Sequence, residues 1–175
     1  MRVRLGDNND YDNCVMGATS DIESTNMLRK VELGDNIAGL NTYSFQECKL
    51  LKTVSLPKTM TSIESSNAFD GCSSLRFIVV PSGTQLVYGF SNANLSEGVS
   101  LPPGVITIGE YAFKGCTFTS TCIPRGVTTI SRESFANCKI HSIDLPDTLT
   151  VIGNSAFKTC ERLMKINIPN GVSVI

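Results

Sequence analysis

The chain has 175 residues, of which 41% are hydrophobic, so it is long enough for one domain with a substantial core. Fifteen Lys and Arg residues nearly balance sixteen Asp and Glu residues and form no basic run, which argues against a nucleic-acid partner and a membrane-surface partner. No apolar stretch approaches the about 18–20 residues of a transmembrane helix, so we expect no membrane insertion in this segment.

Along the chain, similar units follow one another, and a Phe recurs in them every 21–24 residues. The first unit, residues 1–33, is longer and irregular, and the unit at 82–101 is degenerate. The column comprises Ile22, Phe45, Phe69, Phe90, Phe113, Phe135 and Phe157. A period this short excludes helix-pair repeats and propeller blades, which need at least about 33 and about 40 residues.

Each unit also contains an apolar-x-apolar trio followed by Pro or Gly, as in Ile143-x-Leu145 before Pro146. Such a trio predicts a strand with its two apolar residues inward and the middle one outward, and Pro suits the corner that ends it. Neither face of so small a unit can be buried alone, so the units must stack. We therefore predict one mainly β domain over residues 1–175, a right-handed solenoid of about seven coils of 21–24 residues. A parallel sheet covers one face, with short strands and tight helical turns on the other.

The repeat pattern L-x-x-I-x-[IL]-P-x-x-V-x-x-I-x-x-x-A-F-x-x-C resembles that of BspA-like leucine-rich repeat proteins. The units at 113–135, 135–157 and 157–175 carry it best, and "CERLMKINIPNGVSVI" lies close to a family consensus. The resemblance implies a leucine-rich-repeat solenoid that binds proteins, since many such proteins in host-associated bacteria and parasitic protists resemble surface adhesins. The motif residues are scaffold residues, so the resemblance implies no catalytic site.

Three residues after most of these Phe residues stands a Cys, which stacking would arrange as a thiol ladder: Cys48, Cys72, Cys116, Cys138 and Cys160. A linear ladder does not converge as a tetrahedral zinc site does, and Ala93 keeps the size without the sulfur, so we interpret these cysteines as small buried residues. Cys14 lies outside the ladder in an Asp/Asn-rich loop whose spacing departs from the EF-hand pattern. We expect no metal and no cofactor.

Cys122 also lies outside the ladder, at an outward position one coil from His141. Because Cys122 aligns with Asp144, the Cα atoms of Cys122 and His141 should lie about 11 Å apart, too far for a nucleophile and its base. We therefore expect no enzyme; a thiol-dependent enzyme that uses Cys122 stays as the least favoured alternative.

Binding is expected on the outward residues of the trio sheet, because repeat proteins use such surfaces to bind macromolecules. Phe77 and Val79 put two apolar side chains outward on one rung, where we place a partner anchor. The alternative is that the degenerate unit folds over this rung and covers it. The predicted partner-binding residues are Phe77, Val79, Ser55, Ser100, Cys122, Asp144 and Asn167.

The ends expose apolar edges, so we expect either a fragment of a longer array or end-to-end self-association. The predicted function is a non-catalytic protein-binding module for cell-surface adhesion or host-protein recognition, with a matrix or host surface protein as the expected partner. The alternative is an intracellular interaction scaffold in the cytoplasm, where free thiols persist. A sequon at Asn94 would matter only at the surface or outside the cell.

Overall fold

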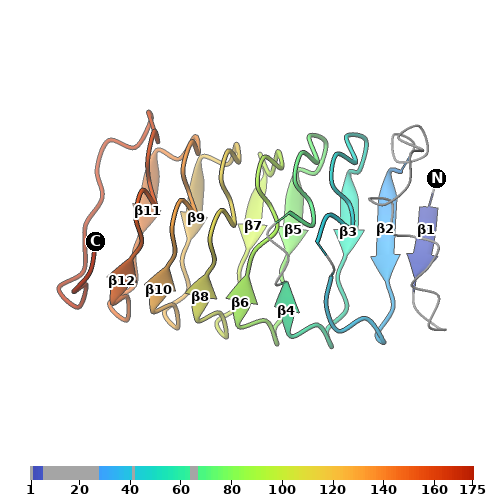
Figure 1. Ribbon diagram of the computed structural model, residues 1–175, viewed down its shortest axis with the longest axis horizontal. Coiled ribbons are helices and arrows are strands. Elements are labelled where there is room, and N and C mark those ends of the chain that lie inside the picture. Colours follow the sequence, from blue (N-terminus) through green and yellow to red (C-terminus); the bar gives the residue numbers. More distant parts are fainter. Residues whose placement is uncertain (1, 6–27, 41, 64–66) are drawn as a thin grey trace.

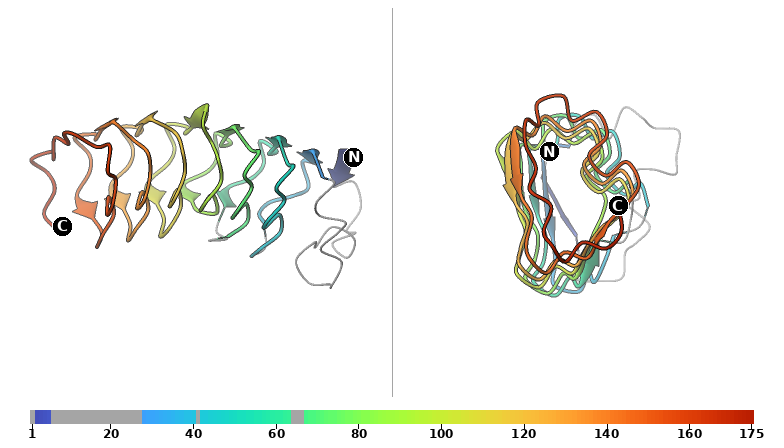
Figure 2. Two further views of the ribbon diagram at one scale, coloured as in Figure 1. Left: turned by 90° about the horizontal axis from the view of Figure 1, so that it is seen from above. Right: turned by 90° about the vertical axis from the view of Figure 1, so that its left-hand side faces the viewer.

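The computed structural model describes residues 2–5, 28–40, 42–63 and 67–175, which wind as stacked coils into an elongated solenoid (Figure 1). The two termini lie at opposite ends of its long axis, and the view along that axis shows the coils superimposed (Figure 2). The described part of the chain contains β-strands and turns but no helix. The predicted mainly β solenoid with parallel strands is confirmed.

One face, here called the front face, is formed by the strands of the apolar trios. These are β1 (Arg2–Leu5), β2 (Lys30–Leu33), β3 (Thr53–Ser55), β5 (Phe77–Val79), β7 (Gly98–Ser100), β9 (Ser120–Cys122) and β11 (Ser142–Asp144). The opposite wall, here called the back sheet, contains β4 (Ser62–Ile63), β6 (Leu86–Val87), β8 (Thr107–Ile108), β10 (Thr129–Ile130) and β12 (Val151–Ile152). All paired strands are parallel, as stacking of successive coils requires.

The alignment of repeats predicts the strand register correctly. Cys122 pairs with Asp144 on β9 and β11, and Val79 pairs with Ser100 on β5 and β7. Ile78 and Ile143 point inward and are buried, whereas Val79 and Asp144 are exposed. The alternation along the strand therefore places the first residue of each of these trios in the core and the middle residue in solvent, as expected.

In the described residues, six corners are turns that begin at the predicted proline, and the corner after β2 begins at Gly34. The carbonyl oxygen of Pro102 accepts a hydrogen bond from the Val105 amide at 3.2 Å, and Pro124 accepts one from Val127 at 3.0 Å. The same bond recurs at Pro57, Pro81, Pro146 and Pro169. Proline presets its φ angle for such a turn, and its missing amide hydrogen costs nothing where the strand has ended.

The expectation of helical turns opposite the trio sheet is wrong. Tyr111 and Gly115, on either side of Phe113, adopt φ angles of 57° and 72°, and Glu133 and Asn137 repeat this around Phe135 with 49° and 60°. A left-handed residue ends a helical run, so these segments are successive turns. Alternate amides, such as that of Lys114 to Tyr111, bond within the turn, and the amides between them bond to the next coil. The Phe113 amide donates to the Ser134 carbonyl oxygen at 2.8 Å, and equivalent bonds join successive coils from Phe45 to Phe135.

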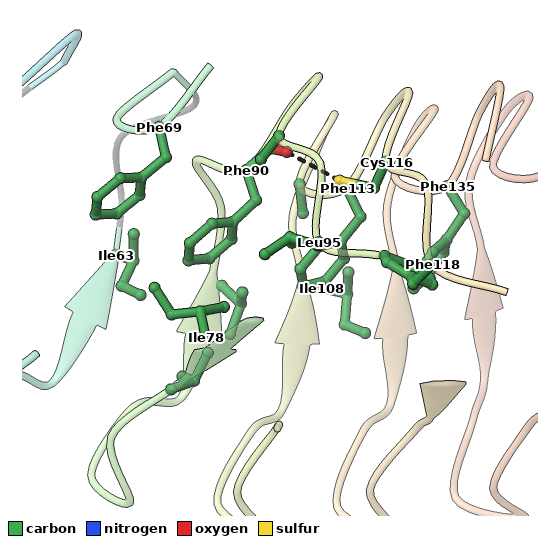
Figure 3. Close-up of a cluster of buried hydrophobic side chains, with 14 of the residues drawn as sticks. Ile63, Phe69, Ile78, Phe90, Leu95, Ile108, Phe113, Cys116, Phe118 and Phe135 are labelled. Carbon is green, nitrogen blue, oxygen red and sulfur yellow. Dashed lines mark hydrogen bonds between the residues drawn. The ribbon is translucent and has the colours of Figure 1, made fainter. Parts of the chain in front are cut away.

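The core between the two walls is a continuous stack of aromatic rings (Figure 3). Phe69 and Phe90 stack with ring centroids 5.3 Å apart, and Phe90 and Phe113 with centroids 5.7 Å apart. Phe118 packs edge-on against Phe113 at 5.9 Å and is fully buried. The predicted Phe column is thus the centre of the core.

The number of complete coils is smaller than predicted. Five coils contain both a front strand and a back strand, because the back sheet has five strands, β12-β10-β8-β6-β4 in spatial order. The last trio, Ile166 to Ile168, forms no strand, and the coils of β1 and β2 have no back strand among the described residues. The expected count of about seven included these terminal units.

Candidate binding face

The predicted anchor residues are exposed on the front face. Phe77 has 44% and Val79 57% of its surface exposed, so the degenerate unit does not cover them and that alternative is wrong. The other five predicted residues, Ser55, Ser100, Cys122, Asp144 and Asn167, are exposed as well. Ser100 pairs with Val79, and Cys122 with Asp144, whereas Asn167 lies beyond the last front strand.

The front face is not one sheet, although the back sheet is. Its strands form three separate ladders, β1-β2-β3, β5-β7 and β9-β11, whereas β3 does not form a ladder with β5, nor β7 with β9. These two interruptions are called seams below. Strands β5 and β7, which carry Phe77 and Val79, therefore stand as a pair between two seams. Sequence analysis predicts a continuous face and misses both seams.

A shallow groove of about 540 Å³ lies over the seam between β3 and β5. Its lining contains four apolar side chains, of which Phe77 and Val79 are exposed, among polar and charged ones: Lys52, Thr53, Val54, Ser73, Ser74, Arg76, Phe77, Ile78, Val79, Asn94 and Glu97. Arg76 Nη1 lies 3.5 Å from Glu97 Oε1, and both side chains are largely exposed. We call this the first groove.

A second groove of about 420 Å³ lies over the seam between β7 and β9. Its lining is Phe77, Glu97, Gly98, Val99, Ser120, Thr121, Cys122, Ser142, Ile143 and Asp144. Phe77 and Glu97 belong to both grooves, so the Phe77 ring stands between them. An exposed ring between two hollows offers a partner contact on both of its sides.

Gly98 explains why the second groove is hollow beside Phe77. It pairs with Phe77 in the ladder, it adopts a φ angle of 104°, and no atom lies within 4 Å of the place that a Cβ atom would occupy. At such a φ angle most side chains are strained. The next two residues in this row are Ser120 and Ser142, so small side chains form the floor as far as β11.

The two grooves differ in charge. The first groove contains the cations Lys52 and Arg76 and one carboxylate, Glu97. The second groove contains two carboxylates, Glu97 and Asp144, and no cation. Neither Lys52 nor Asp144 forms an ion pair with another described residue. Both are therefore available to charged groups of a partner.

The ladder cysteines are structural, as predicted from their position. Cys116 Sγ donates to the carbonyl oxygen of Phe90 in the preceding coil at 3.0 Å (Figure 3), and Cys138 and Cys160 repeat this bond to Phe113 and Phe135. Burial raises the pKa of the Cys116 and Cys138 thiols well above its ordinary value, because the charged thiolate would lose its solvation. These thiols stay protonated and bind the coils together.

Cys122 is exposed, unlike the ladder thiols, and lines the second groove. None of the described cysteines forms a disulfide, and no cluster of three or more metal-binding side chains occurs in the part of the chain that the structure describes. Cys14 and its Asp/Asn-rich loop lie outside the described residues.

Asn94, the residue of the sequon, links three successive coils. Its Nδ2 donates to the Ser73 carbonyl oxygen at 3.0 Å, and its Oδ1 accepts from Thr117 Oγ1 at 2.9 Å. The same oxygen accepts from the Ser96 amide at 3.0 Å. Sequence analysis noted this residue only as a sequon and missed its structural role, because the coil-to-coil contact has no local signal.

Sequence analysis also did not include Arg76 and Glu97 among the predicted binding residues. A signal for their contact exists, since opposite charges stand at equivalent positions of adjacent units, 21 residues apart. Stacking puts such positions on neighbouring strands.

Several solved structures resemble the chain, among them the following two. A leucine-rich repeat protein from Bacteroides ovatus shares 26% sequence identity and superimposes with a TM-score of 0.74, over 83% of this chain and 41% of that protein. The T. pallidum leucine-rich repeat protein shares 27% identity with a TM-score of 0.68, over 79% of this chain and 66% of that protein. The chain thus spans less than two thirds of the length of either protein. No curated protein matches it.

No described segment forms a helix long and apolar enough to cross a membrane. The sequence pattern described as BspA type leucine rich repeat region matches residues 20–88 and 86–175, in six copies. This match covers most of the chain and agrees with the stacked coils, the proline corners and the Phe and Cys columns. The chain belongs to the BspA-type leucine-rich-repeat family.

Proposed function

We propose that this protein is a non-catalytic binding module that holds a protein partner on its front face, in cell-surface adhesion or recognition of host proteins. The observation that carries the proposal is the exposed pair Phe77 and Val79 between the two grooves. The family supports a protein-interaction repeat module, and its members' resemblance to surface adhesins supports a location at the cell surface.

The energetics favour this pair as the anchor. Full burial of an aromatic or branched side chain contributes about 1.5–3 kcal/mol, and roughly half of that remains to be gained at Phe77 and Val79, which expose 44% and 57% of their surfaces. Aromatic residues also dominate interface hot spots. Around the pair stand small polar side chains such as Ser55 and Ser100. An apolar centre with a polar rim is the usual composition of a protein-binding surface.

The experiment is a pull-down with the purified chain against extracellular-matrix proteins and against cytosol of the source cell. The test variant is Phe77→Ser with Val79→Ser. The matched control is Ile106→Ser, because Ile106 is also apolar, has 43% of its surface exposed and lies next to the back strand β8.

We expect saturable capture of a matrix or host surface protein, lost in the double variant and kept in the control. Capture that the double variant leaves unchanged would overturn the front-face site. Capture from cytosol alone would instead identify an intracellular scaffold, for which the free thiol of exposed Cys122 is the supporting observation.

A further inference from the structure

The two grooves, the apolar pair between them and the charges of Lys52 and Asp144 lie in a fixed order along the solenoid. Lys52 directly precedes β3, Phe77 and Val79 lie on β5, and Asp144 lies on β11. A partner that covers the Phe77–Val79 pair and extends over both grooves therefore meets Lys52 on one side and Asp144 on the other, neither of which forms an ion pair with another described residue. Only a matching order of charges avoids unpaired or repelling groups at the interface.

We propose that the front face recognises an extended peptide segment of its partner in which an acidic, an apolar and a basic side chain follow one another. The acidic group binds at Lys52, the apolar side chain packs on Phe77 and Val79, and the basic group enters the second groove at Asp144. This inference rests on the proposed function, since it specifies the partner of the same face.

The spacing of the three groups follows from solenoid geometry. Lys52 lies one coil and one strand position from Phe77, which is about 6 Å at about 4.8 Å per coil and 3.3 Å per residue. Asp144 lies three coils and two strand positions from Phe77, which is about 16 Å by the same spacings. An extended segment advances about 3.3 Å per residue, so the acidic residue stands two positions from the apolar one. The basic residue stands about four positions beyond the apolar one, with a long side chain covering the remaining distance.

Positions 1, 3 and 7 of an extended segment satisfy this spacing and also point to the same side of its backbone. The small floor of the second groove, Gly98, Ser120 and Ser142, leaves room for the segment to approach β9 and β11. Glu97 is paired with Arg76, and exposed Lys165 on the following coil forms no ion pair with Asp144. Asp144 is therefore the group that selects the basic residue.

The test uses three synthetic peptides with blocked ends and one composition. The matched peptide is Asp-Ser-Leu-Ser-Thr-Ser-Arg, and its reversed order, Arg-Ser-Thr-Ser-Leu-Ser-Asp, presents the same spacing in the opposite chain direction. The charge-exchanged peptide is Arg-Ser-Leu-Ser-Thr-Ser-Asp. Binding to the full chain is measured by NMR titration, with the amide resonances of Gly98 and Ser120 as reporters of the second groove.

We expect the matched peptide or its reversed order to bind at least about tenfold more tightly than the charge-exchanged one. The variant Lys52→Glu with Asp144→Lys should invert this preference. The control variant, Lys58→Glu with Asp147→Lys, carries the same charge changes at exposed positions of the same two coils and should keep it.

Three results would each overturn the proposal. They are equal affinities of the wild type for the peptides, an unchanged preference in the Lys52/Asp144 variant, and no saturable shift of the reporter resonances with about 1 mM peptide. If the peptides show no preference while Phe77→Ser with Val79→Ser still abolishes capture of a protein, the charge order is wrong and the front-face site stands. If capture also survives in that variant, the proposed function fails as well.

Discussion

The two walls of this solenoid are made by the same coils and yet differ in continuity. The back sheet forms one ladder of five strands, whereas the front strands form three ladders separated by two seams. The back strands present Thr107 and Thr129 among partly buried side chains, while the front face presents exposed Phe77 and Val79. We infer that the back sheet and the aromatic core stabilise the stack, which leaves the front face free to vary in pairing and in surface chemistry.

This division of roles predicts that aromatic residues of the core and of the front face respond differently to removal. Phe113 is fully buried, stacks on Phe90 and Phe135 and meets Phe118 edge-on. We expect Phe113→Ala to lower the free energy of unfolding by about 3–5 kcal/mol, because it leaves a cavity in the middle of the stack. Urea unfolding followed by circular dichroism measures the change.

The matched variant is Phe77→Ala, which removes an exposed ring from the front face. We expect it to lower the free energy of unfolding by less than about 1 kcal/mol, as surface substitutions usually do. Similar losses in the two variants would contradict the division between a stabilising core and a tolerant front face.

The buried thiols predict how the stack responds to alkaline pH. The pKa values of Cys116 and Cys138 are raised in the folded state, so these thiols keep their protons while those of the unfolded chain ionise. The stability that they contribute is therefore complete below the unfolded thiol pKa, near 8.5, and decreases as pH rises beyond it. Each thiol should lower the free energy of unfolding by up to about 1.4 kcal/mol per pH unit there.

The measurement compares urea unfolding at neutral and alkaline pH for the wild type and for Cys116→Ala with Cys138→Ala, since Ala93 shows that the column accepts alanine. The double variant should be less stable at neutral pH but lose less stability as pH rises. Parallel pH dependences for wild type and double variant would disprove the role of the buried thiols.

Asn94 tests whether side-chain bonds between coils compensate for the seams. Its amide group bonds to Ser73 and Thr117 in the two neighbouring coils, close to the first groove. We expect Asn94→Ala to lower the free energy of unfolding by about 0.5–1.5 kcal/mol, because the bonds of its side chain to both coils are lost, although Thr117 keeps its bonds to the Asn94 carbonyl oxygen.

Ser96→Ala is the control for Asn94, because it also destroys the sequon but keeps the Asn94 side chain, to which residue 96 contributes only its backbone amide. It should change stability by less than about 0.5 kcal/mol in unglycosylated protein. Equal effects of the two substitutions would show that Asn94 does not bind the coils together.

Much of this structure could be predicted from the repeat, because stacking converts equal positions in successive units into neighbours. The pairing of Cys122 with Asp144 and the exposure of Val79 both follow from alignment. The left-handed turns could not be predicted, since residues as different as Tyr111 and Glu133 adopt the same positive φ angle. Such turns depend on bonds to the next coil, which local propensity does not encode.

Part of the candidate site could likewise be predicted from the sequence, and part of it could not. Alternation predicts that Phe77 is outward, but it does not predict that β7 and β9 fail to pair or that grooves form over the seams. Whether two adjacent front strands form a ladder depends on the relative positions of their backbones, which the alternation of apolar residues does not encode.

Thr121 places a polar side chain at an inward position of the front face. It occupies the inward position of β9, where the other rungs have Val54, Ile78, Val99 and Ile143, and its buried Oγ1 has no hydrogen-bond partner among the described residues. An unpaired buried hydroxyl costs free energy, and valine has nearly the same shape without it. We therefore expect Thr121→Val to raise the free energy of unfolding by about 1 kcal/mol. Urea unfolding measures it, with Ser134→Ala, which removes the other such hydroxyl, as a second case of the same sign.

The outcome for Thr121→Val distinguishes two roles of the Thr121 hydroxyl, which lies beside the seam between β7 and β9. If stability rises while peptide binding in the second groove is unchanged, the polar side chain is a misfit that the front face tolerates. If stability falls, the hydroxyl has a partner in solution and helps to hold β9. Thr121 lines the second groove but points inward. A change in peptide affinity without a change in stability would therefore mean that the strands on the two sides of the seam move when the peptide binds. The first result is the one we expect, because the ladder between β9 and β11 and the Phe113–Phe135 stack already position this rung.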